Sequence, residues 1–258
     1  MDNDKINRLK YIIRSLGIES ARLIEENIDL QYIHLKNLKE RLNNDELFLK
    51  LIILNALVSY QLSTTGENWW REFSEYPWED TSDNILKEYI TFLSNSKGNR
   101  RFLEGKIRRI YRLKHFLSTL SLRRFENYYN NMENFRYSIT KTLNTKSSSK
   151  TVVFTVKIFG YGCRMVFSRF ISYPFTIEIP KDSRIERYTT KFTEGDVLKF
   201  WSKIALDSGV PPLHIDSLLW PALGDWNRIK KPLKSLDRNI YQNVKKLIEF
   251  YYPGSHQQ

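Results

Sequence analysis

Two lysines on a single helix are the residues of this chain whose spacing could carry out covalent chemistry. Lys150 and Lys157 lie in a segment predicted to be helical over 150–167. Steps of four, three and four residues return to nearly the same angle on a helix, so Phe154 and Tyr161 share their face. If that face lines a cleft, a nearby cation and reduced hydration favour loss of a lysine proton, as a nucleophilic amine requires. The alternative is an ordinary solvated face.

The other residue types leave few routes to catalysis. Cys163 is the only cysteine, so an internal disulfide, an iron–sulfur cluster and a thiolate-rich zinc site are excluded. The 4 histidines lie at 34, 115, 214 and 256, and no two have short metal-ligand spacing. His214 is expected to pack in the core. We therefore expect no metal and no cofactor, with catalysis by lysine, acidic residues and aromatics.

The charge balance points to a polyanionic partner. The chain of 258 residues has 41 Lys+Arg against 29 Asp+Glu, a formal net charge of +12. This excess favours nucleic acid or an anionic membrane surface. No run of about 18 apolar residues could span a bilayer, and the start MDNDKINRLK lacks the apolar stretch of a secretory signal. The sequence therefore predicts an intracellular protein.

Apolar residues recur at three- and four-residue spacing along most of the chain, which predicts an all-α fold. Asn44 and Asp45 could cap a helix whose apolar stripe comprises Leu47, Leu51, Leu54, Val58 and Leu62. Further helices are expected near 83–95, 100–120, 123–143, 150–167, 194–208, 212–220 and 237–251. The β-like stretch 175–179 is too short to found a sheet and is expected to be an extended connector.

A polar segment, NTKSSS at 144–149, separates two of these predicted helices. It predicts a helix, hairpin, helix arrangement. Small polar residues and the free amides of a helix N-terminus suit such a turn to phosphate contact, and Lys146 adds positive charge. An ordinary serine-rich turn between helices is the alternative.

With these motifs in place, the segment from Lys150 to Asp182 resembles the catalytic core of helix-hairpin-helix DNA glycosylases, and most closely the archaeal GO glycosylase (AGOG) family. The resemblance rests on a lysine opening the helix after the hairpin, in KTVVFTVK, and an aspartate after an extended, proline-containing segment, in IPKDSRI. The interval, 182 − 150 = 32 positions, is similar to that of the archaeal family. Further similar segments are DLQY at 29–32, NALVSYQLSTTGENWW at 55–70 and VPPLHIDSLLW at 210–220. The hairpin has SSS where the broader superfamily has a glycine-rich turn, which leaves its DNA contacts open.

The resemblance implies a bifunctional DNA glycosylase/AP lyase that excises 8-oxoguanine in base excision repair. The enzyme would flip the damaged nucleotide out of the duplex. Lys150 would then attack the sugar and form a Schiff base, and Asp182 would stabilise positive charge and assist deprotonation. Phe154 and Trp220 would stack on the base. The residues implied to line the rest of the base pocket are Gln31, Trp70, Asp216 and, beside them, Lys157.

The same resemblance implies a two-lobed helical architecture with a DNA-binding cleft. Residues 46–165 would form the lobe with the hairpin and Lys150, and 1–45 with 166–258 would form the lobe with Asp182. Lys150 and Asp182 would approach across the boundary. The implied partner is damaged DNA, either double- or single-stranded. The protein would act as a monomer without membrane attachment. Its implied location is the cytoplasm, in association with the nucleoid.

Two other functions fit parts of the pattern. A related glycosylase could excise another lesion, such as uracil or an alkylated purine. A helical DNA-binding protein without catalytic activity could use the charge and the hairpin to bind phosphate, with Lys150 as one more contact. Individual residues also have structural alternatives: Asp182 could cap a helix, and each aromatic could pack in the core.

Overall fold

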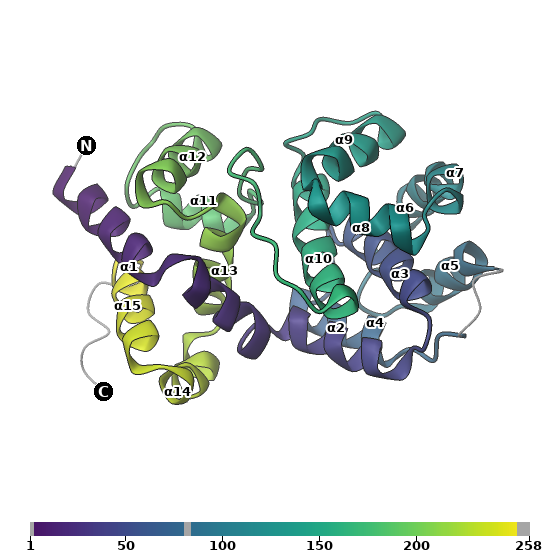
Figure 1. Ribbon diagram of the computed structural model, residues 1–258, viewed down its shortest axis with the longest axis horizontal. Coiled ribbons are helices and arrows are strands. Elements are labelled where there is room, and N and C mark those ends of the chain that lie inside the picture. Colours follow the sequence, from purple (N-terminus) through teal and green to yellow (C-terminus); the bar gives the residue numbers. More distant parts are fainter. Residues whose placement is uncertain (1–2, 80–83, 252–258) are drawn as a thin grey trace. The chain divides into compact units, whose positions relative to one another are not determined.

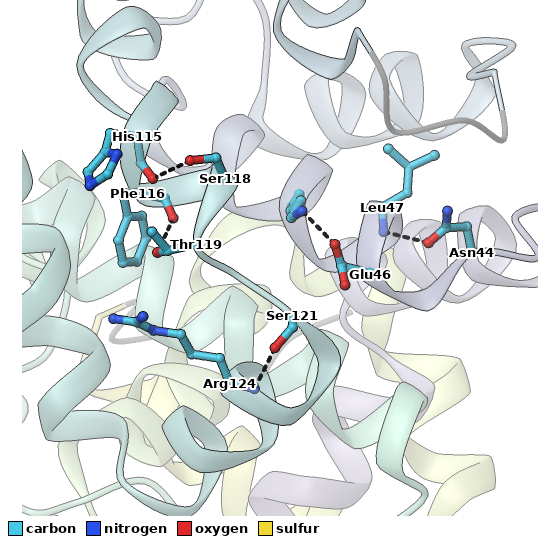
Figure 2. Close-up of polar contacts among 10 residues, drawn as sticks. Asn44, Glu46, Leu47, His115, Phe116, Ser118, Thr119, Ser121 and Arg124 are labelled. Atoms are coloured by element: carbon cyan, nitrogen blue, oxygen red, sulfur yellow. Dashed lines mark hydrogen bonds and ion pairs between the residues drawn. The ribbon is translucent and has the colours of Figure 1, made fainter.

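Short polar residues define where several helices begin. In the computed structural model, which describes residues 3–79 and 84–251, every regular element is a helix. Asn44 caps its helix as predicted, because its Oδ1 accepts a hydrogen bond of 2.9 Å from the Leu47 N–H (Figure 2). Ser121 does the same for the Arg124 N–H at 3.3 Å (Figure 2). The all-α prediction is confirmed.

The chain divides into two units, which are described separately. The central unit comprises residues 30–171. Its helices are α2 (Leu30–Arg41), α3 (Asp45–Leu57), α4 (Gly66–Glu75), α5 (Ile85–Asn95), α6 (Leu103–Arg112), α7 (Lys114–Ser118), α8 (Leu122–Asn130), α9 (Met132–Leu143) and α10 (Lys150–Phe167).

The terminal unit comprises residues 1–29 and 172–258, of which the structure describes 3–29 and 172–251. Its helices are α1 (Asn3–Asn27), α11 (Ser183–Thr189), α12 (Val197–Ser208), α13 (Pro212–Gly224), α14 (Trp226–Leu236) and α15 (Arg238–Glu249). Helix α1 bends at Gly17, whose φ of 67° is in the left-handed region that glycine tolerates.

The core of the central unit is built around α3 and α10, which pack closely against each other. Both are buried over most of their length, and Figure 1 shows α8 and α9 beside α10 in the same unit. A Cβ added at Gly162 would lie 2.2 Å from Ile52 Cδ1, so glycine permits this close approach. The α3–α10 contact therefore fixes the helix that carries both lysines.

The terminal unit has a core of its own. Helix α1 packs against α12, α13 and α15, and apolar residues of these helices form one buried cluster that includes Trp201 and Tyr188. His214 on α13 is fully buried beside Glu25, with 3.0 Å between Nδ1 and Oε1. Its core position confirms the prediction.

Several element boundaries differ from those expected. The helix predicted over 100–120 is two helices that meet at Leu113, and the helix predicted over 123–143 is interrupted at Asn131. The backbone of Asn131 leaves helical geometry and its side chain caps α9. The stretch 175–179 contains no strand, as expected, but it is not extended throughout, because residues 175–176 form a turn in which the Ile177 N–H donates to the Pro174 carbonyl at 3.3 Å.

The unit boundaries follow the packing of α2. This helix contacts α4 and α10, so residues 30–45 belong to the central unit, whereas the sequence placed 1–45 with the C-terminal part. Within the described ranges, no helix is long and apolar enough to cross a membrane. No three His, Cys, Asp or Glu side chains gather as metal ligands in those same ranges.

Candidate active site

Lys150 is the first residue of α10 and follows a turn over 144–149 that joins α9 to α10. Asn144 ends α9 in the left-handed conformation, and the Ser149 N–H closes the turn on the Lys146 carbonyl at 3.0 Å. The helix-hairpin-helix prediction is confirmed in the backbone. Lys150 is exposed and forms no hydrogen bond or ion pair with any residue that the structure describes.

The start of α10 is held in place by a neighbouring helix. Arg109 on α6 donates from Nη2 to Thr151 Oγ1 at 2.8 Å, directly beside Lys150 in sequence. The guanidinium also lies 5.9 Å from the ring centre of Tyr60, and the amine of Lys106 lies 4.7 Å from the same ring. Burial, with the charge of Arg101 as a smaller cause, lowers the pKa of Lys106 to about 8.

Four of the predicted base-binding residues lie in the central unit with Lys150. Phe154 is one turn along α10, and its ring centre is 6.1 Å from that of Trp70 on α4. Trp70 and Gln31, the latter in the first turn of α2, are buried. Lys157 is also buried, with Nζ 5.7 Å from the ring centre of Tyr161.

Asp182 is held by three hydrogen bonds in the terminal unit. Its Oδ1 accepts from the backbone N–H groups of Arg184 and Ile185, at 3.0 and 2.9 Å, and so caps α11. Its Oδ2 accepts from Trp220 Nε1 at 2.9 Å. Asp182 therefore has the helix-capping role that the sequence offered as an alternative. Its second oxygen, Oδ2, accepts from a different donor, the Trp220 indole N–H.

Trp220 has a cation across its ring. The Arg184 guanidinium lies 4.2 Å from the ring centre of Trp220, a cation–π distance. A Cβ at Gly224 would lie 2.5 Å from Arg184 Nη1, so the glycine leaves room for the arginine. Asp216, one turn before Trp220 on α13, is buried.

The predicted residues thus fall into two groups, one in each unit. The central unit brings Trp70 and Phe154 together, and the terminal unit brings Asp182 and Trp220 together. Sequence reasoning did not identify Arg184 or Arg109. Arg184 is inside the IPKDSRI motif, so its proximity to Asp182 was a usable signal, whereas Arg109 is 42 positions from Thr151 and offered none.

Comparison with known proteins supplies an independent finding. The family model described as AGOG, N-glycosylase/DNA lyase, matches residues 10–251. An N-glycosylase/DNA lyase of Methanococcus maripaludis is 50% identical over 240 residues, covering 92% of this chain and 95% of that protein. One of Thermococcus kodakarensis is 44% identical, covering 91% and 90% respectively.

A solved structure has the same fold. The crystal structure of Pa-AGOG, an 8-oxoguanine DNA glycosylase from Pyrobaculum aerophilum in complex with 8-oxoguanosine, superposes with a TM-score of 0.79. The match covers 94% of this chain and 96% of that chain at 23% sequence identity.

Proposed function

Because this chain belongs to the AGOG family of N-glycosylase/DNA lyases, we propose that its substrate is DNA containing 8-oxoguanine and that Lys150 is its nucleophile. The family assignment excludes a DNA-binding protein without catalytic activity. The likeness to Pa-AGOG, whose crystals contain 8-oxoguanosine, supports the choice of lesion. A glycosylase for uracil or alkylated purine is the competing possibility.

The proposed reaction begins when the neutral Lys150 amine attacks C1′ of the damaged nucleotide. The N–C1′ bond to lysine forms as the glycosidic bond breaks, and the base leaves with the bonding electrons and takes up a proton. The sugar ring then opens to give a Schiff base between Lys150 and C1′. Loss of a C2′ proton and of the 3′ phosphate nicks the strand.

Asp182 is proposed to serve this reaction as a fixed negative charge. Its carboxylate would stabilise positive charge on the sugar and accept the proton that the attacking amine loses. The three hydrogen bonds to Asp182 support this role, because they fix the carboxylate before DNA arrives. The approach of Lys150 to Asp182 is part of the proposal.

The damaged base is proposed to enter a pocket that combines aromatic and polar side chains. Phe154 and Trp220 would stack on its two faces. The residues proposed to read its polar edges are Gln31, Trp70 and Asp216, with Lys157 beside them. Because stacking and hydrogen bonds offset the cost of unstacking the nucleotide, such a pocket favours the flipped state.

The observation that carries the proposal is the contrast between two side chains at helix starts. Lys150 opens α10 with its amine exposed, and Asp182 opens α11 with its carboxylate fixed by N–H donors.

The formal charge of +12 supports binding to DNA, double- or single-stranded. We further propose that the protein acts as a monomer in the cytoplasm, associated with the nucleoid.

Borohydride trapping tests the proposal directly. The wild-type protein is incubated with a duplex containing one 8-oxoguanine and with sodium borohydride, which reduces a Schiff base to a stable amine. We expect a covalent protein–DNA adduct and, without borohydride, free 8-oxoguanine and a nicked strand. Matched duplexes with uracil or an alkylated purine serve as controls. An adduct on one of those duplexes alone would assign the enzyme to that lesion.

A further inference from the structure

A groove of about 610 Å³ lies in the central unit between the end of α6 and helices α7, α8 and α9. We name it the basic groove after its lining residues Arg112, Arg124 and Lys141, and His115 lines it as well. Figure 2 shows Arg124 on the same side as His115, Phe116 and Thr119, all of which line the groove. Among the described residues that line it, none is acidic.

The positive charges of the basic groove are not neutralised by carboxylates of the residues that the structure describes. Arg112, Arg124 and Lys141 are exposed, and none forms an ion pair with a carboxylate of the described ranges. Arginines elsewhere in this unit do: Arg136 Nη2 is 2.8 Å from Glu133 Oε2, and Arg169 Nη2 is 3.2 Å from Glu126 Oε1. Cations gathered without a protein counter-ion are expected to attract an external anion.

Two residues that line the basic groove are close in sequence to residues at the hairpin and at the start of α10. Arg109 binds Thr151, the neighbour of Lys150 in sequence. Arg112 follows Arg109 by three residues, about one helical turn along α6. Lys141 is in the last turn of α9, and its carbonyl accepts from the Asn144 N–H that begins the hairpin. An anion in this groove would thus lie next to the hairpin that precedes the proposed nucleophile.

Polar and aromatic side chains complete the lining of the basic groove. Ser138 and Thr142 contribute hydroxyl groups, which can donate to phosphate oxygens. Tyr137 is 63% exposed, and the amine of Lys141 is 5.9 Å from its ring centre. Guanidinium groups bind phosphate oxygens in a bidentate manner. Because Arg112, Arg124 and Lys141 come from three different helices, the groove matches a chain of phosphates better than a single small anion.

We propose that the basic groove binds the sugar-phosphate backbone of the DNA strand next to the damaged nucleotide. The proposal deepens the proposed function, on which it rests, by locating an additional contact for the substrate. Arg112, Arg124 and Lys141 each neutralise one phosphate. The bases in this stretch are not read, so the contact adds affinity without sequence preference.

The test compares two variants of equal charge. The groove variant is Arg112→Gln/Arg124→Gln/Lys141→Gln. The control variant is Lys36→Gln/Arg41→Gln/Lys97→Gln, which removes three exposed cations from α2 and from the residues after α5. In Figure 1, α2 lies at the lower edge of the central unit and α9 at the upper edge. Fluorescence anisotropy with an 8-oxoguanine duplex and an undamaged duplex gives Kd across a salt series.

Counter-ion release predicts the size of the effect. Each phosphate contact contributes about 0.9 to the magnitude of the slope of log K against log salt concentration. The groove variant loses three contacts, so the magnitude of its slope should be lower than that of wild type by about 2.7. Between about 50 and 200 mM salt, wild type should therefore lose about 40-fold more affinity than the groove variant. The control variant should keep the wild-type slope. A third variant, Arg112→Lys/Arg124→Lys, should also keep most of it, because the charge is retained.

The outcomes separate this proposal from the proposed function. The groove variant should still form the borohydride adduct at saturating protein. An unchanged salt slope in the groove variant, or an equal decrease in the control variant, overturns the proposal even if every variant forms the adduct. A slope that decreases only in the groove variant upholds the contact, even if the adduct forms on a different lesion. Binding of an acidic peptide by the groove, with DNA binding unaffected, would also overturn it.

Discussion

The two groups of candidate site residues differ in how firmly their reactive atoms are held. Lys150 in the central unit has an exposed amine at the end of a turn, and its helix is fixed by Arg109 and by the α3–α10 contact. Asp182 in the terminal unit has both oxygens engaged, by two backbone N–H groups and by Trp220 Nε1.

This difference matches the different tasks proposed for the two residues. A nucleophile must move to form a bond, and the Lys150 amine, which has no partner among the described residues, keeps that freedom. A charge that stabilises a transition state is most effective when its position is fixed in advance, because no reorganisation is then needed. The difference predicts that substitutions at Lys150 act on chemistry alone, whereas removal of the whole Asp182 carboxylate acts on both chemistry and stability.

The largest effect is expected from Lys150→Gln. Glutamine has similar length but no nucleophilic amine, so the trapped adduct, base release and strand cleavage should all fall to background. The side chain is exposed and has no partner in the described residues, so the fold and binding to damaged DNA should persist. Gel analysis of the adduct, with circular dichroism and Kd, checks both expectations.

Lys157→Gln is the matched control, two turns along the same face of α10. It should weaken recognition of the lesion and leave the covalent step intact. If Lys150→Gln still forms the adduct and Lys157→Gln does not, the nucleophile has been assigned to the wrong lysine.

A smaller loss is expected at Asp182, where two variants separate charge from capping. Asp182→Asn keeps an oxygen that can cap α11, so stability should change little, while the rate of base release should fall by about 10²–10⁴-fold. Asp182→Ala also removes the cap and should lower the free energy of unfolding by about 0.5–2 kcal/mol more. Single-turnover rates and thermal unfolding measure the two effects. Equal rates for Asp182→Asn and wild type would remove the carboxylate from the mechanism.

Trp220→Phe examines the contact that fixes Asp182 Oδ2. Phenylalanine has no N–H donor, so the hydrogen bond to Asp182 is lost, while an aromatic ring is retained for the Arg184 guanidinium. A hydrogen bond to a charged group contributes about 1.5 kcal/mol, so base release should slow about 10-fold. Trp220→Ala should add a loss of selectivity for damaged over undamaged DNA. A Trp220→Phe enzyme with wild-type rates would assign the indole to stacking alone.

The last effect is on stability and not on catalysis, and it concerns Lys106, the buried residue whose amine lies over the ring of Tyr60. Its pKa is lowered to about 8 in the folded protein, mainly by burial, from 10.5. Between these two values the unfolded chain binds more protons, so stability relative to Lys106→Met should rise with pH, by at most about 1.4 kcal/mol per pH unit. Below about pH 8 the difference should be flat. Urea unfolding of both proteins at several pH values measures it, and a flat difference up to pH 10 would contradict the lowered pKa.

Much of the fold could be predicted because local signals define it. The polar run at 144–149 and the apolar stripe after it gave the start of α10 at Lys150. The interruption at Asn131 was missed because apolar spacing continues through it and neither glycine nor proline interrupts it. The asparagine was itself a signal, since this residue favours N-cap positions.

Contacts within the candidate site were less predictable than the helices. The proximity of Trp220 to Asp182 joins residues 38 positions apart, and it depends on how α11 packs on α13. The same holds for Arg109 and Thr151, which meet because the Arg109 side chain extends from α6 to the start of α10. Such pairs arise from tertiary packing, for which no helical periodicity is a guide. The roles of the eight predicted residues stay predictions until they are measured.

Mass spectrometry of the reduced adduct is the most direct test of the claim that Lys150 is the nucleophile. Wild-type protein is trapped on an 8-oxoguanine duplex with borohydride, the DNA is digested with nuclease, and the protein is digested with a protease that does not cleave at lysine. We expect a sugar-derived mass increase on the peptide containing Lys150, located at that residue by fragmentation. A modification at Lys157, or at any other amine, with Lys150 unmodified would contradict it.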